Sequence, residues 1–158
     1  MTVAEAKSLA CRVLADELPR RWAHTQGVAG RARTLAPILG DRSELIEVAG
    51  YMHLRDVVGA DAVVCQLVAH HSGAAVEADE RGIDALGREF AVPEPGLLHA
   101  LTYCDLTADV NGRPVSVEER LGEILTRYPR GHVVHRSVVR SSPALRSAVV
   151  DVQQRLSA

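Results

Sequence analysis

Residues 63–73 read VVCQLVAHHSG, an almost wholly apolar run that ends in two histidines and is stopped by Ser72 and Gly73. An apolar run of this length, flanked by acidic and glycine-rich sequence, is typical of a buried central helix, although periodicity alone does not separate such a helix from a strand. The end of this helix would place two imidazoles, those of His70 and His71, at the edge of a core. We expect the rest of the chain to be organised around it.

The composition favours helices. The chain has 158 residues, which fits one domain covering residues 1–158. Hydrophobic residues make up 47% of the sequence but aromatic residues only 3%, so Ala, Val and Leu must fill the interior. Strands prefer aromatic and β-branched residues. The sequence therefore predicts an all-α, single-domain helical bundle.

Charge and cysteine content restrict the partners and the compartment. The formal net charge is −2 and the basic residues are spread along the chain, which argues against a nucleic acid polymer or a membrane surface as partner. No apolar span is long enough to cross a bilayer, and no signal peptide is recognised. Cys11, Cys65 and Cys104 are odd in number, lack CxxC spacing and lie in apolar sequence. They are predicted to be reduced core cysteines of a cytoplasmic protein.

Helical spacing and capping signals divide the remaining chain. Pro19 is expected to end one helix and begin the next, and Ser116 with Glu119 forms a capping box. Residues 107–114, TADVNGRP, have turn chemistry throughout, whereas residues 133–139, VVHRSVV, are ambiguous between strand and helix. Helices are expected at residues 3–18, 19–39, 43–58, 83–90, 96–106, 116–128 and 143–156.

Several of these helices carry an inward-facing histidine or aspartate. His24 shares an apolar face with Val28 and Ala32, His53 lies along the apolar flank of its helix, and Asp105 lies in the apolar stretch TYCDL. A carboxylate buried there without a cation would pay a large desolvation cost. Imidazole and carboxylate groups on facing helices can bind one divalent ion. A lone inward histidine is nevertheless more often a hydrogen-bonded core residue, and His70 and His71 could simply interact with a helix dipole.

These residues carry a resemblance to a known family. The segment RWAHTQGVAGRA with His24, a helix ending near His53, LVAHHSG, LTYCDLT with Asp105 and NGRPVSVEERLGEIL resemble the HD superfamily of metal-dependent phosphohydrolases, over about residues 18–156. The resemblance implies an HD-domain-like helical bundle in which a His, a His-Asp doublet and a later Asp hold one or two divalent ions. It also implies attack of a metal-bound water or hydroxide on phosphorus.

The match is incomplete at the doublet. His24 matches the first ligand and Asp105 the last, but His53 is followed by Leu54 instead of aspartate. Leucine removes an oxygen ligand, so we expect at most one ion. Asp56 lies three residues after His53 on the same helix face and is a candidate substitute. Leu54 thus leaves three alternatives: lost activity, a ligand relocated to Asp56, or a missing segment.

The resemblance implies a function. His24, His53, Asp56 and Asp105 are the predicted metal ligands, and His70 and His71 the predicted catalytic groups that contact substrate or protonate a leaving group. The expected protein is a phosphohydrolase that uses one divalent ion (Mn, Fe, Mg, Ni or Zn) on a small phosphorylated or nucleotide-like substrate. The alternatives are a degenerate, non-catalytic HD-like module that binds a ligand or a protein, and a plain helical interaction protein. Whether the chain forms a homodimer stays open.

Overall fold

The computed structural model describes residues 1–51 and 61–158, and all regular secondary structure in these residues is helical apart from one β-bridge between Ala108 and Pro114. The predicted all-α bundle is thereby confirmed. Its elements are α1 (Val3–Leu14), α2 (Pro19–Arg33), α3 (Ala36–Leu39), the 3-10 turn η1 (Gly40–Arg42), α4 (Ser43–Tyr51), α5 (Ala62–His70), the 3-10 turn η2 (His71–Gly73), α6 (Ala74–Glu80), α7 (Leu86–Glu89), α8 (Pro95–Leu106), α9 (Val117–Arg127) and α10 (Val133–Ser157).

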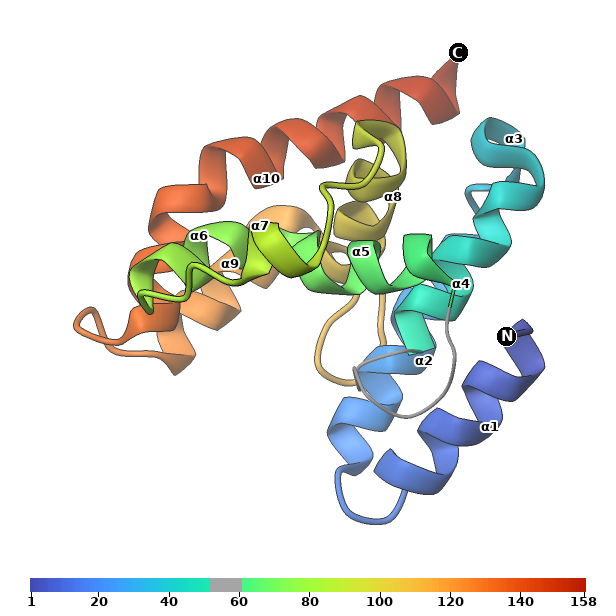
Figure 1. Ribbon diagram of the computed structural model, residues 1–158, viewed down its shortest axis with the longest axis horizontal. Helices are drawn as coiled ribbons and strands as arrows, with labels where there is room; N and C mark the ends of the chain where they lie inside the picture. The colour runs from blue at the N-terminus through green and yellow to red at the C-terminus, as the bar shows by residue number, and fades with distance from the viewer. Residues whose placement is uncertain (52–60) are drawn as a thin grey trace.

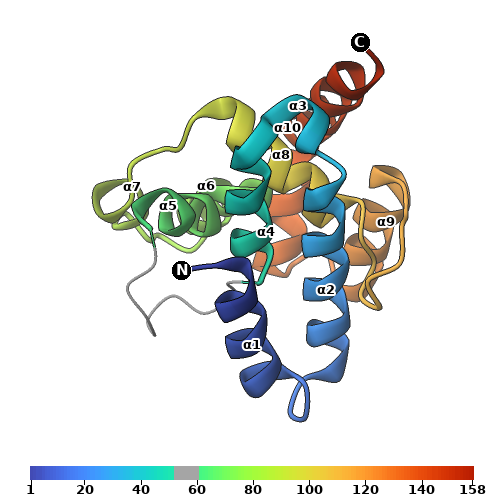
Figure 2. The same ribbon diagram turned by 90° about the vertical axis from the view of Figure 1, so that its right-hand side faces the viewer.

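Helix α8 lies at the centre of this arrangement. It contacts α2 and α4 on one side and α10 on the other, and α5, η2 and α9 also pack against it. Figures 1 and 2 show α1, α2 and α4 grouped together, with α10 crossing the opposite side of the molecule. The largest fully buried side chains are almost all aliphatic, as the composition predicted: Leu35, Ile46, Leu67, Leu101, Leu106, Leu121, Val28, Val149 and Val152.

Residues 63–70 form a helix, as predicted, but it is buried on one face only and is not the central helix. In α5 only Val64, Leu67 and His70 are buried, three residues apart, and the side chains between them are partly exposed. The helix therefore packs one face on the bundle. Helix α8, in which Leu97 and most residues from 100 to 106 are buried, takes the central position.

The second predicted helix is interrupted. Helix α2 begins at Pro19, as expected, but ends at Arg33, and α3 follows after a break. Pro37 has no N–H to donate to the carbonyl of Arg33, which explains why the helix stops there. The predicted apolar face survives the break, because all its members are buried: His24, Val28, Ala32, Leu35 and Leu39.

Other predicted elements differ in extent. The helix expected at residues 43–58 is seen as α4 up to residue 51, and its continuation, with His53, Leu54 and Asp56, lies outside the described residues. Helix α6 occupies sequence that showed no clear periodicity. The ambiguous stretch 133–139 is the first part of α10, which continues through Pro143. Pro143 is solvent-exposed on this helix.

The capping box of Ser116 and Glu119 is confirmed at the start of α9. The prediction of core cysteines holds for Cys104 alone: Cys11 is exposed, because it faces outward on α1, and Cys65 is partly exposed. Among the described helices, none is both long and apolar enough to cross a membrane.

The predicted turn at residues 107–114 packs directly against α2 (Figure 1). Backbone meets backbone here: a Cβ atom added to Gly27 would lie 2.5 Å from the Cα of Gly112, and one added to Gly112 would lie 2.2 Å from the carbonyl oxygen of Ala23. Gly112 also has a φ of +75°, which favours glycine. The two glycines thus hold the turn against the helix.

This contact predicts opposite effects for two glycines of one helix. Gly27→Ala should lower the free energy of unfolding by about 1–3 kcal/mol, because the new methyl group would overlap the backbone of Gly112. Gly30→Ala, whose methyl would have only the Arg33 guanidinium nearby at 3.7 Å, should raise it by about 0.5–1 kcal/mol through helix propensity. Denaturant titration measures both. Equal effects at the two positions would contradict the close docking.

Candidate functional site

The imidazole of His24 and the carboxylate of Asp105 meet between α2 and α8. His24 Nε2 lies 2.9 Å from Asp105 Oδ1, although the residues are 81 positions apart in the sequence. The side chains are 10% and 13% exposed, respectively. The apolar face of α2 turns His24 inward, and Asp105 follows the buried core residues of α8. Two predicted ligands are therefore adjacent and largely shielded from solvent.

The second ring nitrogen of His24 is held by the turn that packs on α2. His24 Nδ1 lies 2.8 Å from the carbonyl oxygen of Asp109. A carbonyl oxygen only accepts hydrogen bonds, so Nδ1 must carry the proton. Nδ1–H donation to a carbonyl is the arrangement that orients a metal-binding histidine and leaves Nε2 for the ion.

The other oxygen of Asp105 is held by a serine from the turn between α5 and α6. Ser72 Oγ donates to Asp105 Oδ2 at 2.5 Å, and the backbone N–H of Ser72 lies 3.3 Å from Thr102 Oγ1, one turn before Asp105 on α8. Both oxygens of the carboxylate thus have a partner on a different element. Sequence reasoning did not single out Ser72, which appeared only as a helix stop.

The two consecutive histidines have different surroundings. His70 is buried, and its Nε2–H donates to the carbonyl oxygen of Phe90 at 2.9 Å, which ties the end of α5 to the segment after α7. His71 is partly exposed, and its Nδ1–H donates to the carbonyl oxygen of Val68 at 2.8 Å. His71 is also close enough to Asp105 for its charge to act on that carboxylate. Of the pair, His71 therefore belongs to the cluster around Asp105.

The electrostatics keep Asp105 ionised. Burial alone would raise the pKa of its carboxyl group, but the hydrogen bond from His24, the charges of His71 and His24, and the hydrogen bond from Ser72 outweigh burial and hold the pKa well below its usual range. The neighbouring thiol behaves oppositely, because burial strongly raises the pKa of Cys104. Cys104 therefore stays protonated and is a poor ligand or nucleophile.

The His24–Asp105 geometry fits one divalent ion. Ligand atoms about 2.0–2.2 Å from an ion lie about 3 Å apart when they are adjacent in an octahedral shell, and Nε2 and Oδ1 are 2.9 Å apart. Across residues 1–51 and 61–158, no three His, Cys, Asp or Glu side chains are grouped so as to hold a metal. The other predicted ligands, His53 and Asp56, lie outside the described residues.

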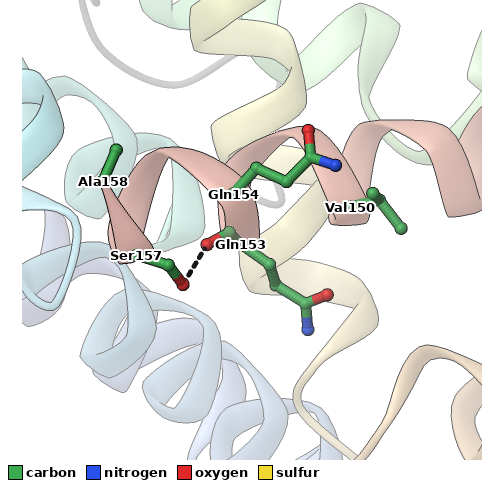
Figure 3. A pocket seen from close by; sticks show the side chains of 5 residues that line it. All are labelled: Val150, Gln153, Gln154, Ser157 and Ala158. Carbon is green, nitrogen blue, oxygen red and sulfur yellow. Dashed lines mark hydrogen bonds between the residues drawn. The ribbon is translucent and has the colours of Figure 1, made fainter.

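Surface hollows elsewhere do not compete with this cluster. One lies at the end of α10 and is lined by Val150, Gln153, Gln154, Ser157 and Ala158 (Figure 3). Four of these residues come from α10 and Ala158 follows it, and none of the five has an ionisable side chain. A second hollow lies between α6 and α7, and the charged residues that line it include Glu77 and Arg81, which form an exposed ion pair with each other. The cluster at Asp105 differs from both hollows, because its ionisable side chains are largely buried.

The pKa of Asp105 predicts how stability changes with acidity. Because the folded state lowers this pKa, the carboxylate stabilises the fold above the unfolded value of about 3.9 and loses that contribution as pH falls below it. Asp105→Asn should therefore cost about 1.5–3 kcal/mol near neutral pH, and the difference from wild type should shrink between about pH 4 and pH 2. Denaturant titrations across this range measure it.

The control for this experiment is Asp151→Asn. Asp151 also meets a histidine, His99, at 3.0 Å, but both side chains are more than one third exposed. Its stability should follow that of wild type at each pH. An Asp105→Asn curve that runs parallel to wild type throughout would contradict the assignment.

Comparison with known proteins does not identify a family for this sequence. No protein-family model matches the sequence, and no curated protein or solved structure is significantly similar to it.

Proposed function

We propose that this protein is a metal-dependent phosphohydrolase that acts on a small phosphorylated or nucleotide-like molecule. The observation that carries the proposal is the contact of His24 Nε2 with Asp105 Oδ1 at 2.9 Å in a largely buried place, with Nδ1 already donating to Asp109. The resemblance of the sequence to the HD superfamily supports it, since His24 and Asp105 match the first and last ligands of that pattern.

The protonation states of the pair point to a cation. With the proton of neutral His24 on Nδ1, Nε2 presents a lone pair to Asp105. A lone pair facing a carboxylate is repulsive, and the hydrogen bond that lowers the pKa of Asp105 requires a proton between the two atoms. The contact is therefore favourable when a proton joins Nε2 to Oδ1, or when the two groups share a metal ion. In the second case each ligand is also oriented by a hydrogen bond, His24 through Asp109 and Asp105 through Ser72.

Each residue of the cluster has a part in this proposal. His24 and Asp105 would hold the ion, and His53 and Asp56 are the predicted ligands that would complete its shell. A divalent ion there would polarise a phosphoryl oxygen, offset phosphate charge and activate a nucleophile. His71, which is partly exposed and whose charge acts on Asp105, would donate a proton or a hydrogen bond to the substrate. His70 is predicted to share this work, although its Nε2–H is donated to Phe90.

Metal binding is the first test. Protein purified without chelator should contain up to one equivalent of a transition metal by elemental analysis. Metal-free protein should hydrolyse p-nitrophenyl phosphate or bis(p-nitrophenyl) phosphate only after Mn²⁺ is added. Asp105→Asn and His24→Gln should each weaken Mn²⁺ binding at least 10–100-fold, because each removes a ligand or its charge.

The matched control again uses the exposed His99–Asp151 pair. His99→Gln and Asp151→Asn remove the same groups from a His–Asp pair that is not part of the cluster, so Mn²⁺ affinity and turnover should stay at the wild-type level. Wild-type protein that binds no divalent ion and hydrolyses neither compound would overturn the proposal. That result would favour the non-catalytic module that binds a ligand or a protein.

A variant at His71 tests the catalytic step separately from metal binding. If its imidazole protonates the leaving group, His71→Gln should lower kcat by about 10²–10⁴-fold while Mn²⁺ affinity changes little. The pH dependence of kcat should lose one limb in this variant. His71→Gln with wild-type kcat would remove His71 from the mechanism and leave the metal site in place.

A further inference from the structure

Ser72 adopts a backbone conformation that costs free energy. Its φ and ψ are 53° and 33°, in the left-handed region, and it is the only residue other than glycine with positive φ in the described parts of the chain. The conformation costs about 1–2 kcal/mol for residues with a Cβ atom. Glycine would adopt it without that penalty.

The turn itself does not require serine. Residues 71–73 turn the chain from α5 into α6, and the next residue, Gly73, also has a positive φ of 82°. At Gly73 the lack of a side chain has a packing reason, since a Cβ there would lie 2.8 Å from Ser141 Oγ. At Ser72 the side chain is instead used, because its hydroxyl donates to Asp105 Oδ2 at 2.5 Å.

We infer that Ser72 is a positioning residue for the metal site, held in a strained conformation so that its hydroxyl orients the Asp105 carboxylate. The inference rests on the proposed function. Strained residues at functional sites persist when the surrounding structure fixes them. Here the N–H of Ser72 is 3.3 Å from Thr102 Oγ1, so α8 helps to hold both the backbone of Ser72 and the carboxylate it bonds.

The hydrogen bond gives the two carboxylate oxygens different tasks. Ser72 Oγ–H binds Oδ2, which leaves Oδ1 facing His24 Nε2, where it would bind the proposed ion. Without the hydroxyl, Asp105 could rotate or bind the ion through either oxygen. Hydrogen bonds that orient a metal-binding group are worth about 10–100-fold in metal affinity.

Ser72→Gly separates the positioning role from a role in stability. The substitution removes the hydroxyl but also the backbone strain, so the midpoint of thermal unfolding of the metal-free protein should stay within about 4 °C of wild type. Its affinity for Mn²⁺ and Co²⁺ should fall about 10–100-fold. The visible absorption spectrum of bound Co²⁺ should change as well, because the carboxylate ligand is no longer fixed. Ser142→Ala removes a buried hydroxyl that bonds only the carbonyl of Val138 in its own helix, and should leave ion affinity and spectrum unchanged.

The outcomes distinguish this inference from the proposed function. Wild type that binds neither ion overturns both. Wild type that binds, with Ser72→Gly binding equally well and giving the same Co²⁺ spectrum, overturns only the role of Ser72. A Ser72→Gly protein that loses more than about 4 °C in its unfolding midpoint makes the serine a stabilising residue and likewise overturns its positioning role. Weaker binding with an unchanged midpoint supports it.

Discussion

The structure of the site depends on the hydrogen bond from His24 Nδ1 to the carbonyl oxygen of Asp109. This bond fixes which ring nitrogen faces Asp105, and it exists only because the turn at residues 107–114 approaches α2 at Gly27. The orientation of one imidazole therefore depends on packing between a surface turn and a helix backbone. Asp105 faces the nitrogen that this bond leaves, and Ser72 holds the other oxygen of Asp105.

Charge burial explains why these groups occur together. A carboxylate as enclosed as that of Asp105 is tolerated only when cationic groups and hydrogen bonds offset its lost hydration. His24, His71 and Ser72 supply that compensation from three separate elements. The polar cluster consequently links α2, η2 and α8 across the aliphatic core. The proposed ion would be one more positive charge beside a carboxylate whose negative charge His24, His71 and Ser72 already stabilise.

The sequence predicted the helical class and several local features from short-range chemistry. The Pro19 start, the capping box at Ser116 and the buried face that carries His24 depend on neighbouring residues, which periodicity and capping rules describe. The inward position of Asp105 was also foreseen, because few polar residues interrupt TYCDL. The sequence did not predict the central position of α8, the helix break before Pro37, or the hydrogen bond from Ser72 to Asp105. They depend on tertiary packing between segments far apart in the chain, which a single periodic pattern does not report.

The close contact of Gly27 with Gly112 also bears on how this molecule tolerates changes in chain length. Surface turns usually accept insertions and deletions, because little packs against them. The turn at residues 107–114 is different, since one added residue would shift Gly112 away from α2 and carry the Asp109 carbonyl with it. The turn behaves as a spacer of fixed length between α8 and α9, and homologous chains that keep the histidine should keep this length.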